Sequence, residues 1–136
     1  MGAPGEVQLD VVGGAPDHAV MADDKIETIA SSSSGTIGRA RNEVRGVAVA
    51  FDSSSRPQPD AFTNSEAFLA SVSSCGVTLI EMHAKETGVP LQRMTVTIEG
   101  RRPPTQPRFT AVTMTFEMTG VSQAQAEDLV ETYRTR

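Results

Sequence analysis

Two neighbouring rows of mainly apolar residues repeat at intervals of three and four through the middle of the chain. The first row consists of Phe68, Val72, Cys75, Leu79 and Met82, and the second of Leu69, Gly76, Ile80 and His83. Residues spaced in this way share one side of an α-helix, which completes a turn about every 3.6 residues. The pattern therefore predicts an amphipathic helix over roughly residues 66–87, with a broad apolar face suited to burial.

Capping signals mark both ends of this predicted helix. Thr63 and Glu66 match a capping box, in which the hydroxyl accepts a bond from a first-turn amide and the carboxylate reaches back to the cap. Asn64 is an alternative cap residue. Gly88 stands where a left-handed C-terminal glycine is expected, and Pro90 stops further helix. These signals place the helix end immediately before Gly88.

Alternation of apolar and polar residues after the helix predicts two strands. Met94, Val96 and Ile98 alternate with polar residues, and a second alternating stretch covers residues 109–118. A proline-rich connection, Pro103–Pro107, separates the two stretches. We expect them to pair as an antiparallel hairpin with a loop of about seven to eight residues.

A final helix is predicted to start at Ser122, because Gln125 completes a second capping box there. Its inner side is expected to carry Ala126, Leu129, Val130 and Tyr133.

The first third of the chain has weaker patterns. Val7–Val12 and Lys25–Ala30 alternate only in part, and Val44–Phe51 is rich in β-forming residues. Ser31–Gly35 is a turn or loop by composition. We interpret this region as short antiparallel strands. The chain is expected to form one domain over 1–136, with a poorly defined N-terminal β region before residue 44.

Composition bounds the class of protein. Apolar residues make up 38% of the 136 residues and aromatic residues only 4%, so the core is thin and a partner subunit would help to complete it. The net charge is −5, which does not favour binding to nucleic acid or to an anionic membrane. For the small basic patch of Arg101, Arg102 and Arg108 we favour a solvated loop over a polyanion site.

Cellular placement is inferred from the signals that the sequence lacks. A single cysteine cannot form an intrachain disulfide. The sequence has neither a signal-peptide pattern nor an apolar run near the length of a membrane span. We therefore expect a soluble, cytoplasmic protein.

Cys75, the only cysteine, has two interpretations. Free cysteine is often a small buried apolar residue, and composition alone favours that role. The small neighbours Ser73, Ser74 and Gly76, however, leave room for a ligand or partner to approach the sulfur. A reactive thiol would need a nearby cation that favours the thiolate. The helix dipole cannot supply it, because Cys75 lies well beyond the first turn.

Candidate activators within the same helix are too distant. His83 follows Cys75 by eight residues, an axial rise of about 12 Å, and Glu66 precedes it by nine, or about 13 Å. His83 and His18 are interpreted as structural or partly exposed histidines, and no metal-ligand spacing is present. An activating arginine must come from another segment or another subunit. The candidates are Arg39, Arg41 and Arg45.

The stretch from Asn64 to Cys75 (NSEAFLASVSSC) resembles the helix opening of the OsmC/Ohr superfamily, in which a glutamate precedes a reactive cysteine. The strand at 95–100 (TVTIEG), the long strand over 108–118 and the helix after Gly120 follow in the family's order. The resemblance covers roughly residues 44–136. The glutamate-to-cysteine interval and the lack of proline at Ser65 are more like the broad OsmC-like branch than the best-known hydroperoxide reductases.

The resemblance implies an α+β fold, with antiparallel sheets packed around a long central helix, in an intertwined homodimer with the cysteine at the subunit interface. It implies that Cys75 is a peroxidatic thiol attacking organic hydroperoxides or hydrogen peroxide in oxidative stress defence, with no cofactor. Glu66 and an arginine, for which Arg45 is narrowly preferred, would orient and activate it. The family's resolving cysteine usually follows the last helix, about where this sequence ends at Arg136. Either the sequence continues to that cysteine, or the protein lacks a resolving thiol. In the second case an external thiol would have to reduce Cys75, or the protein would not be a peroxidase.

Two functions of different classes therefore remain open from the sequence. One is a thiol-dependent peroxidase acting through Cys75. The other is a non-catalytic dimeric module that binds a small apolar ligand or senses oxidants, with Cys75 merely packed.

Overall fold

The computed structural model describes residues 5–9 and 22–136. The described chain has two sheets and two helices. The first sheet has the order β1-β2-β3-β4, and the second pairs β5 with β6. The strands are β1 (Ala30–Ser33), β2 (Arg39–Val44), β3 (Val47–Asp52), β4 (Phe62–Thr63), β5 (Arg93–Arg101) and β6 (Ala111–Thr119); the helices are α1 (Asn64–Thr87) and α2 (Gln123–Arg134). All strand pairs are antiparallel except the short parallel pair β3–β4.

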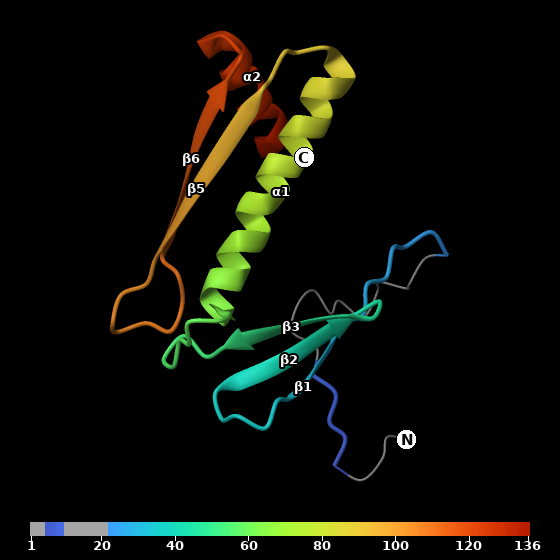
Figure 1. Ribbon diagram of the computed structural model, residues 1–136, viewed down its shortest axis with the longest axis vertical. Coiled ribbons are helices and arrows are strands. Elements are labelled where there is room, and N and C mark those ends of the chain that lie inside the picture. Colours follow the sequence, from blue (N-terminus) through green and yellow to red (C-terminus); the bar gives the residue numbers. More distant parts are fainter. Residues whose placement is uncertain (1–4, 10–21) are drawn as a thin grey trace.

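The two sheets lie at different places along α1 (Figure 1). Strands β5 and β6 run alongside the helix, and α2 packs near its C-terminal end. The sheet of β1–β3 lies beyond the N-terminal end of α1. The predicted α+β fold with a long central helix is therefore confirmed.

Both predicted ends of α1 are confirmed. The Thr63 hydroxyl accepts a bond from the Glu66 amide at 3.2 Å, and the Glu66 carboxylate accepts one from the Thr63 amide at 2.8 Å. Thr63, rather than Asn64, is thus the cap residue. Gly88 ends the helix with φ = 73°, a conformation in which a side chain would be strained.

The cap gives a direct stability prediction. Replacing Thr63 with alanine removes the acceptor of the Glu66 amide and should lower the free energy of unfolding by about 1 kcal/mol. Urea denaturation measures this change. Ser71→Ala is the matched control, because Ser71 is exposed within the same helix and bonds only to a backbone carbonyl there. Equal changes in the two variants would contradict the assigned role of Thr63.

The core lies where α1 meets the β5–β6 sheet and α2. Ile80, Ala84 and Leu129 are its buried apolar residues among those described. The partly buried residues packed around them are Val89, Leu91, Met94, Phe116, Met118, Val121 and Tyr133. Gly76 also faces this side, and a Cβ atom there would come within 3.6 Å of Met114, Phe116 and Tyr133. The second apolar row of the helix is therefore the row that the sheet and α2 cover.

The first apolar row is only partly buried, which corrects the prediction of one broad buried face. Val72 and Leu79 are half-buried, whereas Cys75 is exposed and Phe68 and Met82 are 55% and 63% exposed. The hairpin and α2 of a single chain cover only one side of α1. As a result, Phe68, Cys75 and Met82 form a stripe on the uncovered side, which we call the α1 stripe.

The predicted hairpin is confirmed, with Val96 opposite Phe116 and Ile98 opposite Met114. Burial alternates along β5 as expected. Its loop covers residues 102–110 and is slightly longer than predicted. The final helix is also confirmed: Ser122 caps α2 with Gln125, Leu129 is buried, and Ala126, Val130 and Tyr133 are half-buried.

Predictions for the first third were less accurate. Residues 7–9 and 25–29 form no strand, and residues 10–12 and His18 lie outside the described residues. Of the run Ser31–Gly35 predicted as a loop, the first three serines belong to strand β1, because they pair with β2 and Ser31 donates a hydrogen bond to Asn42 at 2.7 Å. Ser34 and Gly35 lie outside the strand, as predicted. The single stretch predicted over 44–51 contains a turn at Arg45–Gly46, so β2 ends before it and β3 begins after it.

Among the helices of the described residues, only α1 is long and apolar enough to cross a membrane by length and composition. The helix nevertheless has a buried row that packs against the sheet and α2 of its own chain. The core helix of a soluble protein passes the same test of length and composition.

Candidate functional site

Cys75 lies in the middle of α1 with an exposed side chain and is a free thiol. Its neighbour Gly76 faces the sheet, so the helix backbone packs closely there while Cys75 lies away from the core. Within a single chain the thiol is therefore accessible to a reactant and is not a packed core residue.

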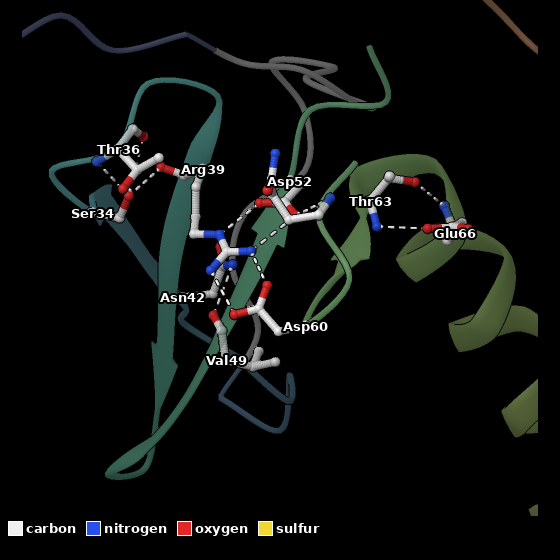
Figure 2. Close-up of polar contacts among 10 residues, drawn as sticks. Ser34, Thr36, Arg39, Asn42, Val49, Asp52, Asp60, Thr63 and Glu66 are labelled. Carbon is white, nitrogen blue, oxygen red and sulfur yellow. Dashed lines mark hydrogen bonds and ion pairs between the residues drawn. The ribbon is translucent and has the colours of Figure 1, made fainter. Parts of the chain in front are cut away.

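The structure does not bring the three predicted site residues together within one chain. Glu66 lies in the first turn of α1, where its carboxylate accepts a hydrogen bond from the Thr63 amide (Figure 2). Arg45 lies in the β2–β3 turn with φ = 49°. Within the described part of the chain, no hydrogen bond or ion pair joins Cys75 to Glu66 or to Arg45.

The other two candidate arginines are engaged elsewhere. Arg39 donates to both oxygens of Asp52, at 2.7 and 3.1 Å, and also to both oxygens of Asp60 (Figure 2). Arg41 forms an ion pair with Glu43. Among the ion pairs of Arg39 and Arg41, only the Arg39–Asp52 pair contains a fully buried group, because Asp52 has no exposed surface. The arginine–aspartate network was not predicted from the sequence, because its members are separated by up to 21 residues.

This network fixes the segment that leads into the central helix. Asp52 ends β3 and accepts a further bond from the Gln58 amide at 3.1 Å. Asp60 precedes β4, whose second residue Thr63 caps α1. Hydrogen bonds from Arg39 hold the pKa of Asp52 and that of Asp60 below their usual range. Arg39 is thus a structural residue at the base of α1.

The lowered pKa values predict a dependence of stability on acid. A carboxyl group whose pKa is lower in the folded state stabilises the fold above its unfolded value, near 4. That stabilisation is lost as the pH falls through the lower folded value. We expect Asp52→Asn to lower the melting temperature at pH 7. Below about pH 4, the melting temperature of this variant should fall less steeply with pH than that of the wild type.

Thermal denaturation from pH 7 to pH 2.5 measures this effect, with Asp128→Asn, an exposed aspartate of α2, as the control. Parallel curves for Asp52→Asn and the wild type would show that the network does not set the acid sensitivity.

One chain leaves additional apolar surface uncovered. Val47 and Val49 of β3 are 61% and 50% exposed, and Phe62 of β4 is 58% exposed. A cavity of about 450 Å³ lies between these strands and the first turns of α1, where Ala67 and Ala70 line it.

Metal-ligating residues are not clustered in the described part of the chain: it contains no group of three or more His, Cys, Asp or Glu that could hold an ion. His83 is half-buried in α1, where its carbonyl accepts a bond from Thr87.

Comparison with known proteins identifies the family. The model of the family described as OsmC-like protein matches residues 57–136, which include α1 with Cys75, the β5–β6 hairpin and α2. The chain belongs to the OsmC-like protein family. No curated protein matches it in sequence.

Solved structures of OsmC-like and related proteins share its fold. An OsmC-like protein from Mycoplasma pneumoniae has a TM-score of 0.71 at 13% identity, covering 83% of each chain. An organic hydroperoxide resistance protein from Elizabethkingia anophelis has a TM-score of 0.64 at 16% identity, covering 85% of each chain. A protein titled organic hydroperoxide resistance protein OsmC, from Legionella pneumophila, has a TM-score of 0.62 at 19% identity, covering 82% of this chain and 83% of its own.

Proposed function

We propose that this OsmC-like protein is a thiol-dependent peroxidase that reduces organic hydroperoxides or hydrogen peroxide through Cys75. The observation that carries the proposal is an exposed free thiol in the middle of the central helix of an OsmC-like chain. The Elizabethkingia and Legionella proteins, whose titles name organic hydroperoxide resistance, have the same fold and support the choice of substrate.

The proposed reaction begins with attack of the Cys75 thiolate on the outer oxygen of the hydroperoxide. The sulfur–oxygen bond forms as the oxygen–oxygen bond breaks, so the sulfur is oxidised by two electrons and the leaving alkoxide takes a proton to become an alcohol. An external thiol then attacks the sulfenic acid and releases water. A second thiol reduces the mixed disulfide and regenerates Cys75.

We further propose that the protein acts as a homodimer, with the α1 stripe at the subunit interface. Phe68, Cys75 and Met82 repeat every seven residues, a spacing at which two helices can pack along a shared seam. The exposed valines of β3 add apolar surface that a second copy can bury. In this arrangement Glu66 and Arg45 reach the thiol either from the partner subunit or after the β2–β3 turn, which carries Arg45, rearranges.

The dimer proposal predicts that a charge on the α1 stripe separates the subunits. Met82→Asp should shift the sedimenting species from twice the 14.4 kDa chain mass towards a single chain, because a carboxylate is costly to bury in an apolar interface. Thr97→Asp, on the exposed side of β5, is the control and should not change the mass. A wild type that sediments as a monomer would contradict the proposal.

The peroxidase proposal is tested by hydroperoxide consumption. The purified chain is incubated with cumene hydroperoxide or hydrogen peroxide, with dithiothreitol, with glutathione, and without any thiol. We expect continuous consumption only when a thiol is present, and a single turnover in its absence. Consumption equal to that of buffer in every arm would instead favour the non-catalytic module. In keeping with such a role, we place the protein in the cytoplasm.

A further inference from the structure

Tyr133 of α2 contacts the turn of α1 that contains Cys75. Its hydroxyl donates a hydrogen bond to the Val72 carbonyl at 3.2 Å, between residues 61 positions apart in sequence. A Cβ atom at Gly76 would come within 3.6 Å of the ring carbon that carries this hydroxyl. In an α-helix the Val72 carbonyl also accepts the Gly76 amide. Tyr133 therefore touches both ends of the hydrogen-bonded turn that contains Cys75.

Surrounding contacts fix the position of the tyrosine side chain. Phe116 of β6 packs against its ring, with the centroids 5.9 Å apart and the planes at 59°. The Met114 sulfur lies 3.8 Å from the hydroxyl oxygen. Tyr133 itself is half-buried and packs against the core. The fold therefore directs its hydroxyl towards the backbone of α1.

Hydroxyl side chains of α1 show which carbonyls a side chain at position 75 can reach. The Ser71 hydroxyl donates to the carbonyl of Phe68, three residues earlier, and that of Thr78 donates to the carbonyl of Cys75. By the same spacing, the Val72 carbonyl is within reach of the Cys75 thiol. A carbonyl oxygen has two lone pairs, and here the helix amide and the tyrosine hydroxyl occupy both. Within the described residues the thiol itself donates no hydrogen bond.

A free Val72 carbonyl would change the chemistry of the thiol. A hydrogen bond from the thiol to this carbonyl would favour the neutral S–H form, because a thiolate has no proton to donate. The thiolate, however, is the form that acts as a nucleophile. A thiol is a weak donor, so the tyrosine hydroxyl holds the carbonyl against it.

Charged groups on the packed elements are remote from this turn or paired. On α1, the nearest are Glu66 and Glu81, about 13 and 9 Å from Cys75 along the helix axis. On α2, Glu131 and Arg134, which flank the tyrosine, pair with each other at 3.6 Å. The half-buried positions of β5 and β6 are uncharged. Removal of the tyrosine hydroxyl therefore changes a hydrogen bond at this turn without changing a charge.

We propose that Tyr133 is a positioning residue for the Cys75 thiol. By donating to the Val72 carbonyl, its hydroxyl denies the thiol an acceptor that would favour the neutral form. The inference deepens the proposed function and rests on it, because that function uses this thiol as its nucleophile. Its two measurements, however, concern the thiol alone and use no hydroperoxide.

Tyr133→Phe tests the proposal, since it removes the hydroxyl and keeps the ring beside Gly76 and Phe116. The full chain contains one cysteine, so its infrared S–H stretching band reports Cys75 alone. We expect the band to move to lower wavenumber in the variant, because the thiol then donates to the released Val72 carbonyl. Alkylation by iodoacetamide should be about two- to fivefold slower at pH 7. It should be nearly as fast as in the wild type at pH 9.5, where most of an ordinary cysteine thiol is ionised.

Thr132→Ala is the matched control, because the Thr132 hydroxyl also donates to a carbonyl but only within α2. It should keep the wild-type band and the wild-type alkylation rates. An S–H band that stays in place in Tyr133→Phe would overturn the proposal. So would slowing of alkylation by the same factor at both pH values, because that outcome would indicate altered access to the thiol.

Failure of the proposed function gives a different pattern. A wild-type chain that consumes no hydroperoxide would overturn the peroxidase proposal and leave the expected shift of the S–H band unaffected. An unchanged band in a chain that does consume hydroperoxide would overturn only the role assigned to Tyr133.

Discussion

Replacing Cys75 with serine is expected to abolish thiol-dependent hydroperoxide consumption, leaving only the rate of the buffer. Serine keeps the size and the exposed position of the side chain but cannot supply the sulfur that is oxidised and then reduced in each cycle. Cys75 is the only cysteine of the chain, so no second thiol can replace it. The loss should be complete for organic hydroperoxides and for hydrogen peroxide alike.

The informative control for this variant is Ser74→Ala, an adjacent exposed position on the same turn of α1. It should retain the wild-type rate, and both variants should keep the wild-type melting temperature. If the Cys75→Ser variant still consumed hydroperoxide faster than buffer, the observed activity would not depend on the Cys75 thiol.

The second large effect concerns stability. Ile80→Ala is expected to lower the free energy of unfolding by about 3–4 kcal/mol, because Ile80 is fully buried where α1 meets the sheet and α2. A loss of this size is a large fraction of the total stability of a small domain. Denaturant unfolding followed by circular dichroism measures it.

Glu81→Ala is the comparison for that variant, since Glu81 is the exposed neighbour in the same helix. Its effect should stay within about 0.5 kcal/mol. A loss below 1 kcal/mol for Ile80→Ala would contradict the position of the core between α1, the β5–β6 hairpin and α2.

Local signals explain why the second half of the chain was predicted well. The capping boxes at Thr63 and Ser122 and the C-terminal Gly88 act within a few residues, so the sequence itself contains both partners of each contact. Strand β1 was missed because its serines gain their structure from distant pairing with β2. Composition favours a loop there, but hydrogen bonds to the distant strand β2 make these residues a strand.

The orientation of α1 required the tertiary structure. Both apolar rows of the helix had the correct spacing, and periodicity alone could not show which of them faces the sheet. Gly76 lies in the second row, but a glycine lowers helix stability wherever it lies and so does not by itself mark a buried face. In the folded chain it is buried, with Met114, Phe116 and Tyr133 in van der Waals reach of a Cβ atom there. The engagement of Arg39 with Asp52 and Asp60 was similarly hidden, because three segments meet only in the folded chain.

Trapping of sulfenic acid is the most direct test of the central claim that Cys75 is a peroxidatic thiol. The full chain is mixed with one equivalent of cumene hydroperoxide in the presence of dimedone, and the peptide containing Cys75 is analysed by mass spectrometry. We expect a dimedone adduct on most of the Cys75 peptide, and none in a sample without peroxide. A thiol that remains fully alkylatable by iodoacetamide after excess hydroperoxide would contradict it.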